Sequence, residues 1–163
     1  MGRQQHLKLD IHTNFVNSCF IEIDKTCINS KRNVIIGCIY KAPLLSITHF
    51  NDKMDALLNK LSTENKYVYL LGDTNINLGD SCSNNLHIQE FRNLLSAYSF
   101  IQLIHRPTRV TKLSSTIIDN IFTNDCSENI FCSGIFATKA YSDHFPIFGV
   151  VKHCMLENRK IIF

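Results

Sequence analysis

Short apolar runs and amphipathic stretches follow one another along the chain, and their periodicity predicts strands and helices in mixed order. Alternation over Cys19–Asp24 predicts a strand, and the apolar run Val34–Tyr40 predicts a second strand that forms a loose hairpin with it. Pro43 ends this strand because proline cannot donate a backbone hydrogen bond. A helix capped by Ser46 or Thr48 then has one apolar face, made of Phe50, Met54, Leu57, Leu58 and Leu61.

The second half of the chain continues in the same way. An apolar strand, Tyr67–Leu71, precedes an amphipathic helix that ends near Tyr98. Three more strands are predicted at Phe100–Ile104, Ile130–Ala137 and Phe145–Val151. Because strands outnumber helices and hairpin spacing mixes with strand–helix–strand spacing, we expect a layered α/β or α+β domain with helices outside a sheet. Residues 1–18 are predicted to be a poorly ordered segment, 19–151 the domain and 152–163 a tail.

Composition narrows the class of protein. The chain has 163 residues, of which 45% are hydrophobic and 19% charged, so a single folded domain is expected and disorder is not. The net charge of +3 permits a phosphate-rich partner without requiring one. Seven cysteines without a CxxC pair indicate reduced, buried thiols of an intracellular protein, and no apolar run approaches the ~18 residues that would span a membrane.

Polar residues at strand ends are the candidates for chemistry. Asp73 and Asn75 follow the strand Tyr67–Leu71 and, two residues apart, share one side if the strand continues. Together they could hold a water and a phosphate oxygen; alternatively they form a plain turn. Asp119 interrupts the apolar run Ile117–Phe122, where an unpaired carboxylate would be costly to bury. It is either a rim residue that reaches solvent or a carboxylate that orients a histidine.

A third polar stretch, Ser142–His144, supplies such a histidine. Asp143 is a hard oxygen ligand suited to Mg²⁺, whereas His144 exchanges protons near neutrality. The alternative is a turn that only starts the next strand. An Asp–His pair, an Asp–Asn pair and a divalent cation together meet the needs of phosphodiester hydrolysis. Acyl transfer fits less well without a Gly-x-Ser-x-Gly motif, and zinc fits less well because no two histidines are spaced i, i+4.

The ordered set of motifs resembles the exonuclease–endonuclease–phosphatase superfamily. Tyr40 followed by Pro43, then Leu71–Asn75, then Ser142–His144 carry this resemblance. The segment from Arg106 to Asn124 is more specifically similar to the apurinic-type endonuclease domain of non-LTR, LINE-like retrotransposons. The resemblance covers roughly residues 19–151. Each motif alone is weak, and the order and spacing of the set make it specific.

The resemblance implies a four-layer α/β sandwich, with two sheets face to face and helices outside. It implies a Mg²⁺-dependent endonuclease, with Mn²⁺ as an alternative, that nicks DNA and thereby primes reverse transcription. A reverse transcriptase, fused or associated, is the implied protein partner, and the nucleus is the implied place of action.

The resemblance also implies roles for residues that match the family's motifs. Asp73 would activate the attacking water or protonate the leaving oxygen, and Asn75 would position water or phosphate. His144 would stabilise the pentavalent phosphate, with Asp119 orienting its ring. Asp143 would help to hold the metal.

Five further residues are assigned to the substrate by the same resemblance. Tyr40 would lie near the scissile phosphate. Arg106, Thr108 and Arg109 would contact the DNA backbone, by charge as much as by analogy. Lys41 stands where an arginine is usual, which keeps a cation but loses the planar fork of a guanidinium.

One departure from the family concerns the start of the domain. Family members carry an Asn and a metal-binding Glu well before the position of Tyr40, whereas here 39 residues precede it and Glu22 is the only Glu among them. We therefore expect the chain to be the carboxyl-terminal part of the domain, with apolar surface exposed on the sheet of the Val34–Tyr40 strand. A catalytically inactive remnant and a non-enzymatic binding module remain alternatives to an active nuclease.

Overall fold

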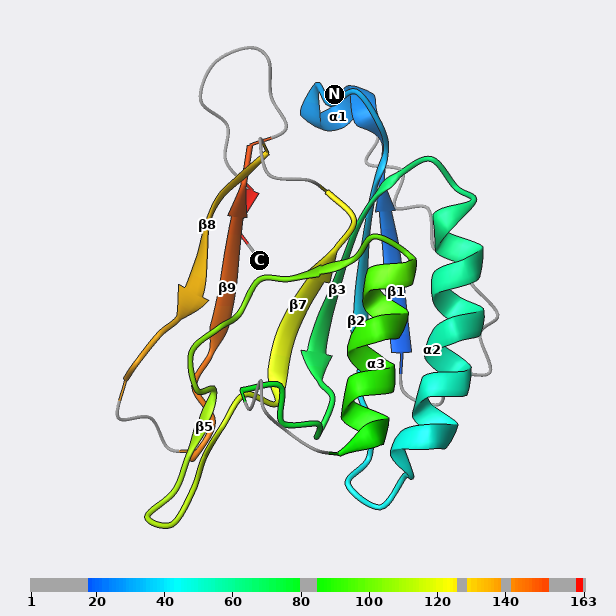
Figure 1. Cartoon of the computed structure of the whole chain (residues 1–163). Coiled ribbons are helices and arrows are strands. Elements are labelled where there is room, and N and C mark those ends of the chain that lie inside the picture. Colours follow the sequence, from blue (N-terminus) through cyan, green and yellow to red (C-terminus); the bar gives the residue numbers. More distant parts are fainter. Residues whose placement is uncertain (1–17, 80–84, 126–128, 139–141, 153–160, 163) are drawn as a thin grey trace.

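The computed structural model describes residues 18–79, 85–125, 129–138, 142–152 and 161–162, so nearly all of the predicted N-terminal segment and tail lie outside it. A mixed five-stranded sheet forms its centre (Figure 1). The antiparallel β1–β2 pair and the strand at Tyr67 are confirmed, although the predicted strand at Phe100–Ile104 shrinks to two residues. The strand order is β1 (Ser18–Ile23), β2 (Val34–Ile39), β3 (Tyr67–Asp73), β7 (Asp119–Thr123) and β4 (Ile101–Gln102).

Two helices cover one face of this sheet, α2 (Ile47–Ser62) and α3 (Leu86–Ala97) (Figure 1). The predicted cap of α2 is Ser46, whose Oγ accepts a hydrogen bond from the His49 amide at 3.2 Å. A third, four-residue helix, α1 (Lys25–Ile28), lies in the β1–β2 connection where only a polar turn was expected. Asp24 caps it by accepting from the Thr26 amide, a local side-chain effect that hydrophobic periodicity does not reveal.

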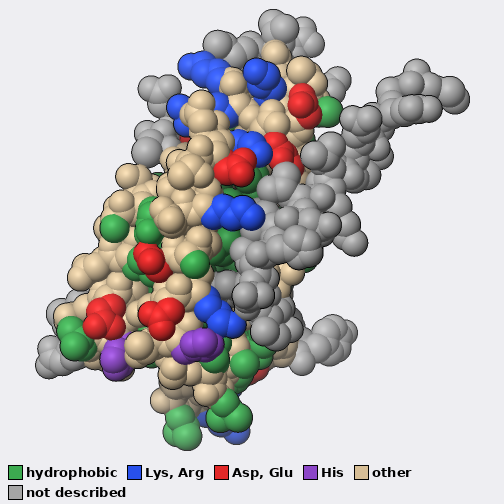
Figure 2. All heavy atoms as spheres, turned by 90° about the vertical axis from the view of Figure 1, so that its right-hand side faces the viewer, with side chains coloured by type: hydrophobic (Ala, Val, Ile, Leu, Met, Phe, Trp, Pro, Cys, Tyr) green, Lys and Arg blue, Asp and Glu red, His purple; other side chains and the backbone are tan. Residues whose placement is uncertain are grey.

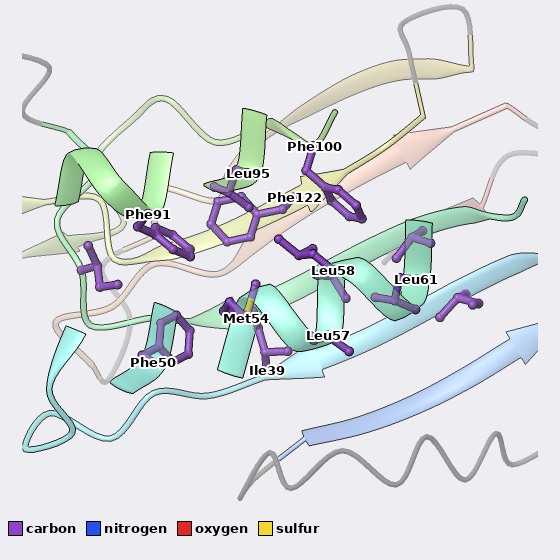
Figure 3. Close-up of a cluster of buried hydrophobic side chains, with 14 of the residues drawn as sticks. Ile39, Phe50, Met54, Leu57, Leu58, Leu61, Phe91, Leu95, Phe100 and Phe122 are labelled. Carbon is purple, nitrogen blue, oxygen red and sulfur yellow. The ribbon is translucent and has the colours of Figure 1, made fainter. Parts of the chain in front are cut away.

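The helices and the sheet enclose an apolar core that contains every helical residue predicted to face it (Figure 3). Phe91 lies at its centre, with ring centroids 5.7 Å from both Phe50 and Phe122. The Phe91 and Phe122 rings meet edge to face, the arrangement that aromatic quadrupoles favour. This core packs α2 and α3 against the sheet, and so it positions the strands that carry the site.

A smaller sheet packs on the opposite face of the large one. It has the order β10 (Ile161–Ile162), β9 (Ile147–Val151), β8 (Ile130–Ile135), and its core includes Tyr69, Ile121 and Val151. The described residues thus form helices, sheet and sheet, which are three of the four layers of the expected α/β sandwich. A two-stranded hairpin, β5 (Arg109–Val110) and β6 (Ser115–Thr116), lies at the edge of these layers.

The second core leaves part of the large sheet uncovered. It includes Val34 and Ile36 of β2 but not Cys38, and Cys38 and Ile21 are exposed. The expected exposed apolar surface on this sheet is therefore present. The prediction of buried thiols is wrong for the four described cysteines, because periodicity identifies a strand but not which face is covered; the exposed ones are Cys19, Cys27, Cys38 and Cys132.

The side of the molecule at α2 shows no concentration of basic side chains among its described residues (Figure 2). In Figure 2, which views the molecule from the α2 side, acidic and basic side chains are interspersed and hydrophobic side chains form only small groups. A nucleic-acid footprint would instead concentrate Lys and Arg on one face. In the described part of the chain, no helix has the length and apolar character needed to cross a membrane.

Candidate active site

Two neighbouring strands bring two acids together. β3 and β7 are antiparallel with Asp73 directly opposite Asp119, so sequence positions 46 apart become cross-strand partners. Gly72 is required just before Asp73, because its φ of +151° is unfavourable for other residues and a Cβ there would lie 1.8 Å from the Ile39 carbonyl oxygen. The Lys41 amide then donates to the Asp73 carbonyl at 3.0 Å. The close approach of β2 to β3 thus fixes where Asp73 stands.

Asp119 also contacts the histidine. Its Oδ2 lies 3.0 Å from His144 Nδ1, and the two side chains are 17% and 33% exposed. His144 is held by a β-bridge to Arg109 and by its amide, which donates to Ser142 Oγ at 3.1 Å. The structure therefore contains the Asp–His pair that sequence reasoning raised as one alternative for Asp119. A carboxylate in this position sets the tautomer and orientation of an imidazole.

Asn75 fixes the carboxylate of Asp73. Its amide nitrogen donates to Asp73 Oδ1 at 2.8 Å, and its side-chain Nδ2 lies 2.9 Å from the Lys41 carbonyl and 3.3 Å from Asp73 Oδ2. Asn75 has a φ of 47°, a conformation that Asn tolerates better than most residues. The plain turn weighed as an alternative is present, and that turn also aims the Asp73 carboxylate.

The surroundings of Asp73 raise the pKa of its carboxyl. Burial raises the pKa of its carboxyl above the usual value, and the Asp119 carboxylate raises this pKa further. The Asn75 amide, His144 and Arg109 act in the opposite direction. A carboxyl whose pKa moves toward neutrality is suited to exchanging a proton with a water or a leaving oxygen.

Three side chains in this cluster could hold a cation. Ligand atoms of Asp73, Asp119 and His144 all lie within 4.8 Å of one another. Two carboxylates fit Mg²⁺ or Mn²⁺, which prefer oxygen ligands and keep several waters.

Asp143, which is predicted to help hold the metal, is not in this group. Its Oδ2 accepts from Arg109 Nε at 2.7 Å, and this hydrogen bond lowers the pKa of Asp143. Arg109 draws the carboxylate into an ion pair outside the group.

Two residues assigned to the DNA surface are buried instead. Thr108 Oγ1 accepts from the amides of Ile118 and Asp119 at 3.1 and 3.0 Å, so it positions the backbone at the catalytic candidate. Lys41 is 2% exposed, and its Nζ donates to the Ala42 carbonyl at 3.3 Å. Burial lowers the pKa of Lys41 and the Asp73 carboxylate opposes that effect. The motif pattern carried no signal of which side chains point inward.

The remaining assigned residues stay at the surface: Tyr40 is 40% exposed, and Arg106 is also exposed. A cleft of about 540 Å³ opens beside the acid–histidine pair. Its polar lining includes Asp119, Ser142 and His144, and its apolar lining includes Leu71, Phe145 and Ile147.

Asn77 is a positioning residue that sequence reasoning missed. Its Oδ1 accepts from the amides of Ile117 and Gly79 at 3.0 and 3.1 Å, and so it joins the loop after β3 to the segment entering β7. The repeat Asp73-x-Asn75-x-Asn77 was the available signal.

Glu22 occupies the other end of the sheet. It lies opposite Ile35 in the β1–β2 register, whereas the cluster lies beyond the far end of β2. Its two carboxylate oxygens accept from Asn33 Nδ2 at 2.5 Å and Lys66 Nζ at 3.0 Å. Glu22 is therefore a structural ion-pair residue and does not reach the cluster.

Comparison with solved structures finds the same fold in several proteins. The endonuclease domain of TRAS1, a telomere-specific non-LTR retrotransposon, superposes with a TM-score of 0.66 at 15% identity, covering 84% of this chain and 62% of that one. The Xenopus laevis APE2 catalytic domain gives 0.55 at 17% identity, covering 83% and 54%. Staphylococcus aureus beta toxin with bound magnesium ions gives 0.56 at 17% identity, covering 80% and 56%.

The chain thus spans about six tenths or less of the length of these structures. No curated protein matches its sequence. A family model described as endonuclease–reverse transcriptase matches residues 34–148, which include both acids, Asn75 and His144. With the fold and this match together, the chain belongs to the endonuclease–reverse transcriptase family of the exonuclease–endonuclease–phosphatase superfamily.

Proposed function

We propose that this protein hydrolyses a phosphodiester bond of DNA in a reaction that depends on Mg²⁺ or Mn²⁺. The observation that carries the proposal is the contact of Asp119 Oδ2 with His144 Nδ1, 3.0 Å apart, beside a second carboxylate fixed opposite Asp119 in the sheet. Phosphoryl transfer needs two things: a group that exchanges a proton, and positive charge near the phosphate. The Asp–His pair lines a cleft of about 540 Å³, and a ligand atom of Asp73 lies within 4.8 Å of the pair.

The side chains have distinct tasks in this proposal. Asp73, with its raised pKa, takes the proton of the attacking water or donates one to the leaving oxygen, and Asn75 holds its carboxylate in place. His144 directs Nδ1 at Asp119, which leaves Nε2 to bind a phosphate oxygen. A divalent cation held by Asp73 and Asp119 would supply positive charge against the phosphate oxygens.

The finer proposal is an endonuclease that nicks DNA to prime reverse transcription, with a fused or associated reverse transcriptase and action in the nucleus. Support comes from the family match and the fold shared with the TRAS1 endonuclease domain. Arg106 and Tyr40 are exposed and would contact the DNA backbone and the scissile phosphate. Arg109 would contact DNA from its ion pair with Asp143.

Nicking of a supercoiled plasmid tests the central proposal. Purified protein should convert it to the open circle with Mg²⁺ or Mn²⁺ and not with EDTA. His144→Ala should lower the rate by about 10²- to 10³-fold, the range expected for losing one stabilising group. His87→Ala is the matched control, since His87 is an exposed histidine of α3 paired with Glu90. Nicking that survives His144→Ala would contradict the assignment.

A second candidate, DNA binding without cleavage, has one observation in its favour. Glu22, the Glu before Tyr40, is engaged far from the cluster, so the described residues offer only two carboxylates and a histidine to a cation. This candidate predicts that protein retards a fluorescent duplex in a salt-dependent manner but never nicks it. Arg106→Ala should weaken that binding, whereas His144→Ala should leave it nearly unchanged.

A further inference from the structure

The uncovered face of the large sheet carries two thiols that face each other. Cys19 of β1 and Cys38 of β2 are directly opposite in the antiparallel register, so their side chains project from the same face. Both are exposed and both are free thiols. Among the described cysteines, no other two are cross-strand partners, since Cys27 lies in α1 and Cys132 in β8.

The geometry of this pair permits a disulfide. Directly opposed residues of an antiparallel pair have Cα atoms about 4.5 or 5.5 Å apart, depending on their place in the ladder. A disulfide joins residues whose Cα atoms are about 4.4–6.8 Å apart. Bonding Cys19 to Cys38 thus requires rotation of two exposed side chains and leaves the β1–β2 register intact.

The two thiols differ in their relation to the cleft. Cys38 lines it together with Asp119 and His144, and Cys38 is the register partner of Leu71, two residues before Asp73. Cys19 lies one strand farther from the acids and is not among the lining residues. A group attached to Cys38 would therefore enter the space where the proposed substrate binds, whereas the same group on Cys19 would lie outside it.

We propose that Cys19 is a resolving thiol that keeps thiol adducts off Cys38 and so keeps the cleft open. The thiolate of Cys38 attacks a low-molecular-weight disulfide, forms a mixed disulfide and releases one small thiol. The thiolate of Cys19 then attacks the Cys38 sulfur and releases the second small thiol. Two protein thiols are oxidised to one disulfide while the small disulfide is reduced to two thiols. The consequence for DNA access rests on the proposed function, but the thiol exchange does not.

Oxidised glutathione is the probe for the test. The full chain is incubated with it, quenched with acid and mapped by peptide mass spectrometry, and the nicking rate is measured before and after treatment. Wild type should yield a Cys19–Cys38 linked peptide, lacking two hydrogen atoms, and should keep its rate. Cys19→Ser should carry one glutathionyl group on Cys38, and its rate should fall at least tenfold on treatment. Dithiothreitol should restore it.

Two variants make the comparison specific. Cys38→Ser should carry the adduct on Cys19 with no fall in rate on treatment, and Cys132→Ser should behave like wild type. A stable glutathionyl group on Cys38 of wild type, or a pair that reacts no faster than Cys27 and Cys132, would overturn the proposal. If the untreated protein does not nick DNA, the proposed function fails while the mass map still decides the thiol chemistry.

Discussion

The two ends of the β3–β7 pair both carry carboxylates, but the groups around these carboxylates differ. At one end Asp73 faces Asp119, so that two acids are direct cross-strand partners. At the other end the Tyr69 hydroxyl donates to Asp125 Oδ2 at 2.5 Å, and Asn129 Nδ2 donates to Oδ1 at 2.8 Å. Asp125 is 2% exposed, deeper than either acid of the cluster. We call these the acidic end, Asp73 with Asp119, and the satisfied end, Asp125 with Tyr69 and Asn129.

Neighbouring groups decide the difference, since the strands are the same. At the satisfied end the Asp125 carboxylate accepts hydrogen bonds from two donors, and burial followed by the Asp125 contact raises the pKa of the Tyr69 hydroxyl, which keeps it protonated. At the acidic end burial raises the pKa of Asp73 and the nearest strand partner is another acid that adds to the effect. An arrangement that would be more stable with an extra positive charge or proton marks a site, whereas a fully hydrogen-bonded acid marks a structural element.

The largest expected effect on stability is at the satisfied end. Asp125→Ala should lower the free energy of unfolding by about 3 kcal/mol, because it leaves the buried Tyr69 hydroxyl and the Asn129 amide without their acceptor. Urea denaturation followed by circular dichroism measures this change. The double variant Tyr69→Phe/Asp125→Ala should lose less than the sum of the two single variants. A loss below about 1 kcal/mol for Asp125→Ala would show that this end is not a structural anchor.

Thr108 tests how the acidic end is held in place, with a smaller expected effect. Thr108→Val keeps the shape but leaves the buried amides of Ile118 and Asp119 without an acceptor, and should cost about 1–2 kcal/mol. Thr108→Ser keeps the acceptor and is the matched control. In the nicking assay Thr108→Val should lower the maximal rate more than Thr108→Ser does. Equal behaviour of the two variants would argue against a positioning role.

These expectations show how far the sequence alone could lead. Periodicity predicted the helical core residues correctly, because helix and strand periods follow from backbone geometry. Polar residues near strand ends pointed to three separate stretches, which contain Asp73, Asn75, Asp119 and His144. The structure joins these stretches through the β3–β7 register and the contact of Asp119 with His144.

Side-chain direction was the part that the sequence could not supply. Thr108 and Lys41 are buried and Cys38 is exposed because the packing of other strands decides which side of a loop or strand is covered. The same holds for Asp143, since the sequence around a carboxylate does not tell which cation it will meet in the folded chain. The pairing of β10 with β9 came from a stretch without informative periodicity.

The pH dependence of stability sharpens the comparison further. The pKa of Asp73 in the folded state lies above its ordinary value of 3.8. Between these two pKa values, Asp73 therefore binds more protons in the folded state than in the unfolded state. Stability therefore falls as pH rises through this interval. Asp73→Asn mimics the protonated form and should stabilise the metal-free protein at pH 7, by less than about 1 kcal/mol because solvent screens the pair.

The stabilisation by Asp73→Asn should disappear as the pH falls below 3.8. Thermal unfolding in buffers with EDTA measures the stability difference between the variant and wild type. The range from about pH 3 to pH 7 covers the pH values over which carboxyl groups ordinarily titrate. Asp52→Asn, an exposed α2 residue, is the control. A gain that stays constant with pH would show that the pKa of Asp73 is not raised in the folded protein.

The smallest expected effect concerns the ion pair of Arg109 with Asp143, which lies between the cleft residues Ser142 and His144 in the sequence. Both side chains are more than 40% exposed, so the ion pair should add little to stability. Its effect should instead appear in the titration of Asp143, whose pKa is lowered first by the hydrogen bond from Arg109. Arg109→Ala should raise this pKa toward the ordinary 3.8, as measured by carbon-13 NMR of the side-chain carboxyl.

Arg106→Ala, an exposed arginine of the same loop, is the matched control and should leave the Asp143 titration unchanged. Adding salt to about 1 M shortens the Debye length to about 3 Å. In wild type this should raise the Asp143 pKa by only part of the Arg109→Ala shift, because the hydrogen bond from Arg109 Nε to Asp143 Oδ2, at 2.7 Å, is not fully screened. An Asp143 pKa that does not respond to Arg109→Ala would mean that the hydrogen bond from Arg109 is not formed in solution, and that Asp143 is not held by an ion pair outside the acidic end.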